Sequence, residues 1–132
     1  MTPNEKEIVY LVDGSSYVHR AYHAIRNLSN SKGFPTNVIF GFTKMILKLL
    51  ADATPAYLAV VLDAKGPTFR HEIYEAYKAN RPPMPDDMAE QIPITKEILK
   101  KLGIRVMEKE GYEADDIIGT LAHRLREQGF AI

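Results

Sequence analysis

The chain has 132 residues, of which 45% are hydrophobic and 26% charged, so it fits one globular domain and leaves no room for two. Its 17 basic and 17 acidic residues give zero formal net charge, which argues mildly against a nucleic-acid partner unless the charges are segregated. The absence of cysteine excludes disulfide scaffolds, thiolate zinc sites and cysteine nucleophiles, so any metal ligands must be oxygens or histidines. The longest apolar run, residues 56–62, is far shorter than the roughly 20 residues of a membrane helix. We expect a cytoplasmic protein without a membrane partner.

Two buried strands are predicted first. Residues 8–12 and 57–62 are continuous β-branched and aliphatic runs, each followed by an aspartate, which is typical of strands buried on both faces of a parallel sheet. Between them, a start signal at residues 35–37 precedes a helix of about 15 residues. Its apolar positions recur at the helical period and predict one core-facing side: Val38, Ile39, Phe42, Met45, Ile46, Leu49 and Leu50.

The second half of the sequence also predicts alternating helices and strands. An amphipathic helix carries Ile94, Ile98, Leu99 and Leu102, stops at Gly103, and has Pro93 either opening it or kinking an earlier turn. A short strand is predicted at 104–107, and after Gly111 a helix with an apolar stripe closes at Gly129. The stripe is Ala114, Ile117, Ile118, Leu121, Ala122 and Leu125. This order predicts a Rossmann-like α/β layer fold with right-handed crossovers. Residues 130–132 read as the first half of another strand, so we expect a longer protein.

Acidic residues follow each predicted strand. In a parallel sheet, ligands bind beyond the carboxyl ends of the strands. The five acids predicted to converge there are Asp13, Asp63, Glu113, Asp115 and Asp116. Such a cluster is costly unless a cation neutralises it, and Mg²⁺ or Mn²⁺ prefers these oxygen ligands. Taken singly, each acid also fits an ordinary turn or helix cap.

A long excursion, residues 64–85, replaces a short strand-to-helix loop, and such connections are usually functional or mobile. Cations alternate with aromatic residues along it, which suits single-stranded nucleic acid. The cations are Lys65, Arg70, Lys78 and Arg81, and the aromatics are Phe69, Tyr74 and Tyr77. The alternative is a solvated amphipathic helix, ended by the prolines at 82, 83 and 85. His19 and His23, four residues apart, have zinc-like spacing but no third ligand nearby, so surface or partly buried histidines are the better interpretation.

Four segments together resemble the N-terminal 5′ nuclease domain of bacterial DNA polymerase I, which is related to flap endonucleases. They are LVDGSSYVHRAYHA (11–24), GFPT (33–36), VVLDAKGPTFRHEIYEAYKANRPPMPDDM (60–88) and GYEADDIIGTLA (111–122). The resemblance runs from about Ile8 to the last residue. It implies a three-layer, mainly parallel fold of the PIN or 5′ nuclease type that is incomplete at the C-terminus. It also implies a cytoplasmic, nucleoid-associated protein with a linked polymerase domain that these residues lack.

The resemblance also implies roles for particular residues. The five acids match the metal-site carboxylates, Lys78 and Arg81 match cations that approach the scissile phosphate, and Tyr77 matches an aromatic of the same arch. Arg20 matches a basic position near the substrate, and Arg70 is expected to contact DNA. The 64–85 segment would be the helical arch that admits a 5′ single strand or flap. Asn37 stands where many members have glycine, which we expect to be harmless.

These implications predict metal-assisted phosphodiester hydrolysis, in which two divalent ions about 4 Å apart activate water and stabilise the leaving oxygen. Lys78 and Arg81 would stabilise the phosphate charge that builds up. One alternative is a truncated module that binds DNA and cuts nothing. Another is a phosphatase with Asp13 as nucleophile, although Ser15 stands where such an enzyme has a second aspartate.

Overall fold

The computed structural model describes residues 6–64 and 83–132, and all structural statements below concern these residues. Strands and helices alternate along them as predicted, and the strand bounds agree with the predictions to within one residue. The elements are β1 (Val9–Asp13), α1 (Gly14–Ala24), α2 (Asn37–Ala53), β2 (Tyr57–Val61), α4 (Asp86–Ala89), α5 (Ile92–Lys101), β3 (Arg105–Met107) and α6 (Ala114–Glu127). Pro93 opens α5 rather than kinking it, since it occupies the first turn, where its missing amide costs nothing.

The three strands form one parallel sheet in the order β1-β2-β3. Ala131 lies beside the opposite edge of β1, where it forms a parallel bridge to Ile8. The Val9 amide donates to the Ala131 carbonyl at 2.8 Å, and the Ala131 amide donates to the Glu7 carbonyl at 2.9 Å. After β1, the chain adds β2 and β3 on one side of this strand and then returns to its other side at Ala131, so the direction of strand addition reverses at β1. Ligands of open α/β sheets bind at the carboxyl end of the strand where this reversal occurs, and Asp13 is the residue at that end of β1.

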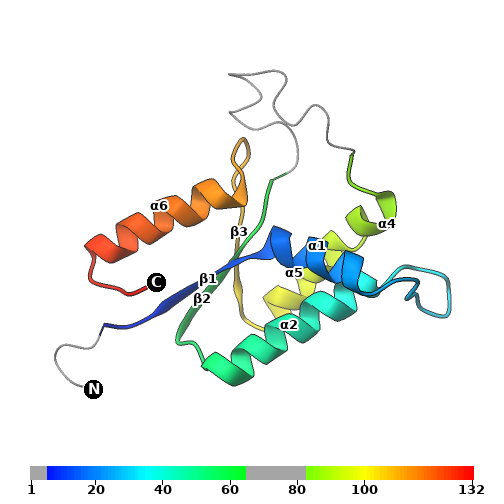
Figure 1. Ribbon diagram of the computed structural model, residues 1–132, viewed down its shortest axis with the longest axis horizontal. Helices are drawn as coiled ribbons and strands as arrows, with labels where there is room; N and C mark the ends of the chain where they lie inside the picture. Colours follow the sequence, from blue (N-terminus) through cyan, green and yellow to red (C-terminus); the bar gives the residue numbers. More distant parts are fainter. Residues whose placement is uncertain (1–5, 65–82) are drawn as a thin grey trace.

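Helices cover both faces of the sheet (Figure 1), so the fold has three layers. The helices α1, α2 and α5 pack together on one face, and α6 lies on the other against β1 and β2. The main core lies between the sheet and the three-helix layer and consists of Val12, Val18, Val38, Phe42, Ile46, Val60, Met88, Leu99 and Ile104. The α/β layer fold predicted from the alternation of elements is confirmed.

The apolar stripes are buried less completely than the periodicity predicts. Ile94 and Leu102 of the predicted α5 stripe are exposed, whereas Thr95 is buried, with its hydroxyl satisfied by a hydrogen bond to the Gln91 carbonyl at 2.9 Å. Of the α6 stripe, only Ala114 is fully buried, and its other members are half-buried. The reason is that α6 covers its face of the sheet alone within the described residues. None of the described helices is long and apolar enough to cross a membrane.

Candidate metal-binding edge of the sheet

Asp13 is both the last residue of β1 and the N-cap of α1. Its Oδ1 accepts a hydrogen bond from the Ser16 amide at 3.1 Å, and its Oδ2 accepts one from the Ser16 hydroxyl at 2.7 Å. The capping interpretation of this aspartate is therefore confirmed. A carboxylate offers about four lone-pair directions. The two bonds to Ser16 orient Asp13 and leave lone pairs available for a further ligand.

Asp63 follows the neighbouring strand β2 and is held from two sides. Its backbone amide donates to the Ser15 hydroxyl at 2.9 Å, which ties it to the first turn of α1. Its carboxylate Oδ1 accepts from the Ala114 amide at 2.6 Å, so it caps the first turn of α6. Because Asp13 lies at the same end of the adjacent parallel strand, the structure brings Asp13 and Asp63 to one edge of the sheet.

The close approach of α1 to β2 depends on Gly14. A Cβ at this position would lie 2.7 Å from Leu62 Cδ2, 2.7 Å from Val60 Cγ1 and 3.0 Å from the Val61 carbonyl oxygen. Real side chains do not make such contacts, so only glycine fits without displacement of its neighbours. The first turn of α1 can therefore approach β2 closely enough for Ser15 to bond the Asp63 amide.

The acidic turn of α6 lies beside Asp63. Asp116 Oδ2 accepts from the Glu113 amide at 3.0 Å. This bond reaches back from the third residue of α6 to its N-cap and so closes the first turn of the helix. Asp115 is exposed in the same turn. The Asp63 bond to Ala114 thus places Glu113, Asp115 and Asp116 at the end of the helix that abuts the Asp13 and Asp63 edge.

A complete metal cage is not formed by these residues. In the described ranges 6–64 and 83–132, no three His, Asp or Glu side chains lie in an arrangement that could hold a metal ion. The five carboxylates gather around one edge through strand ends and helix starts, but they do not converge on a common point. The donor set itself consists of carboxylate oxygens, which suits a hard divalent ion.

The remaining predicted site residues divide into two groups. Arg20 is exposed on α1, with its guanidinium 5.6 Å from the centre of the Tyr17 ring. His19 and His23 are exposed on the same helix, in agreement with their interpretation as surface or partly buried histidines. Arg70, Tyr77, Lys78 and Arg81 lie outside the described residues.

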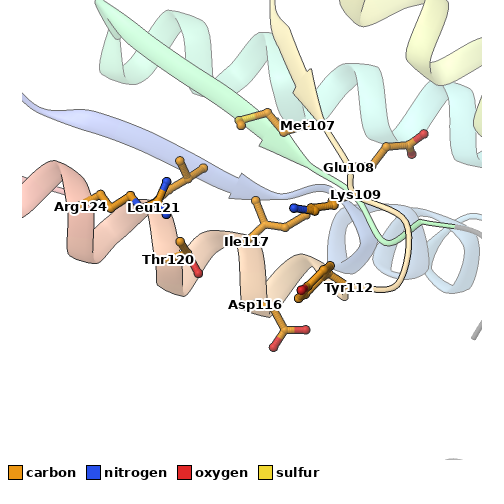
Figure 2. A pocket seen from close by; sticks show the side chains of 9 residues that line it. All are labelled: Met107, Glu108, Lys109, Tyr112, Asp116, Ile117, Thr120, Leu121 and Arg124. Atoms are coloured by element: carbon orange, nitrogen blue, oxygen red, sulfur yellow. The ribbon is translucent and has the colours of Figure 1, made fainter. Parts of the chain in front are cut away.

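A hollow of about 420 Å³ lies beside this edge, between the end of β3, the loop after it and α6 (Figure 2). It is lined by Met107, Glu108, Lys109, Tyr112, Asp116, Ile117, Thr120, Leu121 and Arg124. Among the five predicted carboxylates, only Asp116 lines it, so the hollow is offset from Asp13 and Asp63. The Lys109 ammonium lies 5.3 Å from the centre of the Tyr112 ring, within the range of a cation–π contact, in the loop that precedes α6.

Sequence reasoning missed the two serines that hold the aspartates. Neither Ser15 nor Ser16 was predicted to hold an aspartate, although the Ser15 hydroxyl accepts from the Asp63 amide and the Ser16 hydroxyl donates to Asp13. The signal for Ser16 was its position three residues after an N-cap aspartate. No local signal identifies Ser15, because its partner is 48 residues away.

Comparison with known proteins is consistent with this fold. A family model described as the N-terminal resolvase-like domain of 5′-3′ exonucleases matches residues 8–132. A 5′-3′ exonuclease of Aquifex aeolicus is 49% identical over 124 residues, which cover 94% of this chain and 43% of that protein. DNA polymerase I of Bacillus caldotenax is 45% identical over 127 residues, covering 96% of this chain and 14% of that protein. The chain therefore spans less than half the length of these curated relatives.

Solved structures show the same fold. The structure of T5 5′-exonuclease with bound zinc matches with a TM-score of 0.65 and 21% identity over 92% of this chain and 45% of that chain. The catalytic core of Rad2 in complex with a DNA substrate matches with a TM-score of 0.50 and 22% identity, over 83% of this chain and 33% of that chain. Since the family model spans nearly the whole sequence, the chain belongs to the family of 5′-3′ exonuclease N-terminal resolvase-like domains.

Proposed function

We propose that residues 1–132 are the N-terminal part of a metal-dependent 5′-3′ exonuclease or flap endonuclease within DNA polymerase I. The protein would hydrolyse DNA phosphodiesters in replication and repair, in the bacterial cytoplasm near the nucleoid. Family membership over residues 8–132 supports the proposal, and so do long relatives named DNA polymerase I. The observation that carries it is the hydrogen bond from the Ala114 amide to Asp63, because it joins the acidic turn of α6 to the sheet edge where Asp13 ends β1.

Mg²⁺ or Mn²⁺ is the proposed cofactor. The carboxylates at this edge supply only oxygen donors, and hard divalent ions prefer these over sulfur or nitrogen. A bound divalent ion would provide an activated water and would neutralise charge on the leaving oxygen. The hydrogen bonds from Ser16 and Ala114 hold the carboxylates of Asp13 and Asp63 in fixed orientations, so these two are the proposed principal ligands. Glu113, Asp115 and Asp116 would complete the binding of the ions, directly or through water.

The proposed substrate is DNA with a 5′ single strand or flap. Lys78 and Arg81 are proposed to stabilise the negative charge that builds on the scissile phosphate. Arg70, Tyr77 and Arg20 are proposed to contact the DNA. Arg20 is exposed on α1, the helix capped by Asp13, so it is accessible to a strand that approaches the same edge.

Asparagine variants provide the sharpest test. Asparagine caps a helix about as well as aspartate, so Asp13→Asn keeps α1 capped while it removes the negative charge. Asp63→Asn likewise keeps an oxygen acceptor for the Ala114 amide. In the intact protein with Mg²⁺ or Mn²⁺, we expect each variant to cleave a labelled 5′-flap substrate at least about a hundredfold more slowly, with DNA binding largely retained.

The matched control is Asp52→Asn, because Asp52 is exposed at the end of α2 and pairs only weakly with Lys48 at 3.3 Å. It should cleave at the wild-type rate. Full activity of Asp13→Asn or Asp63→Asn would refute the proposed role of that carboxylate. If the wild-type protein binds flap DNA but cleaves nothing at any divalent-ion concentration, the chain belongs to a non-catalytic DNA-binding module instead. No feature of the structure favours the phosphatase, in which Asp13 would form a phosphoaspartate.

A further inference from the structure

A polar cluster with a buried centre and an exposed end lies on the three-helix side of the sheet, away from the five predicted metal-site carboxylates. It consists of Tyr22, Asn37, Asp87 and Gln91 and is called the anchor cluster here. Gln91 is completely buried and Asn37 is 6% exposed. Burial of an amide side chain is costly unless its donors and acceptors are paired. The pairing within the anchor cluster therefore shows which parts of the chain it holds together.

Gln91 uses its whole hydrogen-bonding capacity. Its Oε1 accepts from the amides of Val38 and Ile39 at 2.8 and 3.0 Å. Its Nε2 donates to Asn37 Oδ1 and to the Asp87 carbonyl, both at 2.7 Å. Thr36, the N-cap residue of α2, makes no side-chain capping bond. Gln91, which is distant in the sequence, caps the first turn of α2 instead by accepting from its free amides. A fully satisfied buried network of this kind is rigid, and it joins α4 to the start of α2.

The same cluster joins α4 to the last turn of α1. Asn37 Nδ2 donates to the carbonyls of Tyr22 and Ile25 at 3.2 and 2.9 Å. The Tyr22 hydroxyl donates to Asp87 Oδ1 at 2.8 Å. This hydrogen bond to the Asp87 carboxylate raises the pKa of the Tyr22 hydroxyl above its usual value, because a phenolate would lose the bond and face a negative charge. The Tyr22 hydroxyl therefore stays protonated and able to donate throughout the neutral pH range.

The helix α1 thus holds both flanks of the 64–85 segment. Near its start, Ser15 accepts from the amide of Asp63, which immediately precedes the segment. Near its end, Tyr22 bonds Asp87, which follows the segment in the first turn of α4. Tyr22 is seven positions after Ser15, so these two points lie about 10 Å apart along the helix axis. A single rigid helix therefore sets the spacing between the two ends.

We propose that Tyr22 and Gln91 are positioning residues that hold the start of α4 at a set distance from Asp63. They fix the two points between which residues 65–82 run. The inference rests on the proposed nuclease, since those residues include Lys78 and Arg81, the cations assigned to the scissile phosphate. A displacement of about 1 Å in such a group can reduce the rate of the chemical step about a hundredfold. The anchor cluster would therefore act on the reaction without contact to the substrate.

The first experiment measures the anchoring directly. The chain contains no cysteine, so cysteines introduced at Lys48 and Met84, both exposed, give two specific spin-labelling sites. Electron-spin distance measurements should give one narrow distribution in the otherwise wild-type protein. We expect Gln91→Ala to broaden it at least twofold and Tyr22→Phe to broaden it less. Unchanged distributions in both variants would overturn the proposal, whatever their activity.

Two matched controls separate positioning from general destabilisation. Tyr57→Phe removes a comparable tyrosine bond, to Glu7, at the start of the central strand β2, and Gln128→Ala removes an exposed glutamine after α6. Both should leave the distance distribution unchanged. Asp87→Asn keeps an acceptor for the Tyr22 hydroxyl and should behave like wild type, whereas Asp87→Ala should resemble Tyr22→Phe.

The second experiment uses the intact protein, saturating 5′-flap DNA and a divalent ion under single-turnover conditions. Gln91→Ala should slow cleavage about tenfold or more, Tyr22→Phe less, and Asp87→Asn should retain the wild-type rate. A broadened distance distribution with an unchanged cleavage rate would overturn the positioning role. If the wild-type protein does not cleave, the proposed function fails, while the distance measurement still decides whether Tyr22 and Gln91 anchor α4.

Discussion

Gly14 permits the close packing that brings the first turn of α1 to the strand that precedes Asp63. In a Gly14→Ala variant, the new methyl group would lie 2.7 Å from the side chains of Leu62 and Val60 and 3.0 Å from a backbone oxygen. Overpacking of this kind costs about 1–3 kcal/mol. The gain in helix propensity, about 0.5–1 kcal/mol, offsets only part of this cost. We therefore expect a net loss of about 0.5–2 kcal/mol.

Thermal and urea unfolding monitored by circular dichroism would measure this loss. At about 4 °C per kcal/mol for a domain of this size, Tm should fall by roughly 2–8 °C. Gly119→Ala is the matched control, because Gly119 is exposed within α6 and a Cβ there has no neighbour within 4 Å. It should stabilise the protein by about 0.5–1 kcal/mol. A Tm for Gly14→Ala equal to or above that of Gly119→Ala would refute the packing argument.

Two further predictions concern single polar groups. The Thr43 hydroxyl is buried without a partner among the described residues, so Thr43→Val should raise the free energy of unfolding by about 1 kcal/mol; urea melts that show destabilisation would contradict this. The hydrogen bond to Glu7 raises the pKa of Tyr57, so its contribution to stability is fully present below about pH 10 and is lost as pH rises through the raised pKa. Ultraviolet titration should show one late-ionising tyrosine fewer in Tyr57→Phe, and loss of a tyrosine that ionises at the ordinary pKa instead would show that the bond is absent.

Much of the fold could be predicted because its signals are local. Buried parallel strands are encoded as short continuous apolar runs, so the first two strands were located from these runs alone. The helix starting near Val38 was found from its 3.6-residue period, and its observed bounds agree with that prediction. Periodicity failed where burial depends on a neighbour: Ile94 and Leu102 have apolar spacing but face outward, and most of the α6 stripe is half-buried. An apolar side chain is buried only if another element covers it, and this is a tertiary property.

The candidate site divides in the same way. The sequence alone predicted that Asp13 and Asp63 stand at the carboxyl ends of two strands of a parallel sheet, because strand ends and helix starts are encoded by nearby residues. That these two strands are neighbours is shown only by the structure. Only the tertiary structure decided that Asp63 caps α6 across 51 positions, that Ser15 bonds the Asp63 amide, and that Gln91 caps α2 from a segment 53 positions away. These bonds join residues that are far apart in the sequence and that meet only when the helices pack on the sheet. Their geometry is therefore set by close packing, as at Gly14, and no local motif or hydrophobic periodicity in the sequence predicts it.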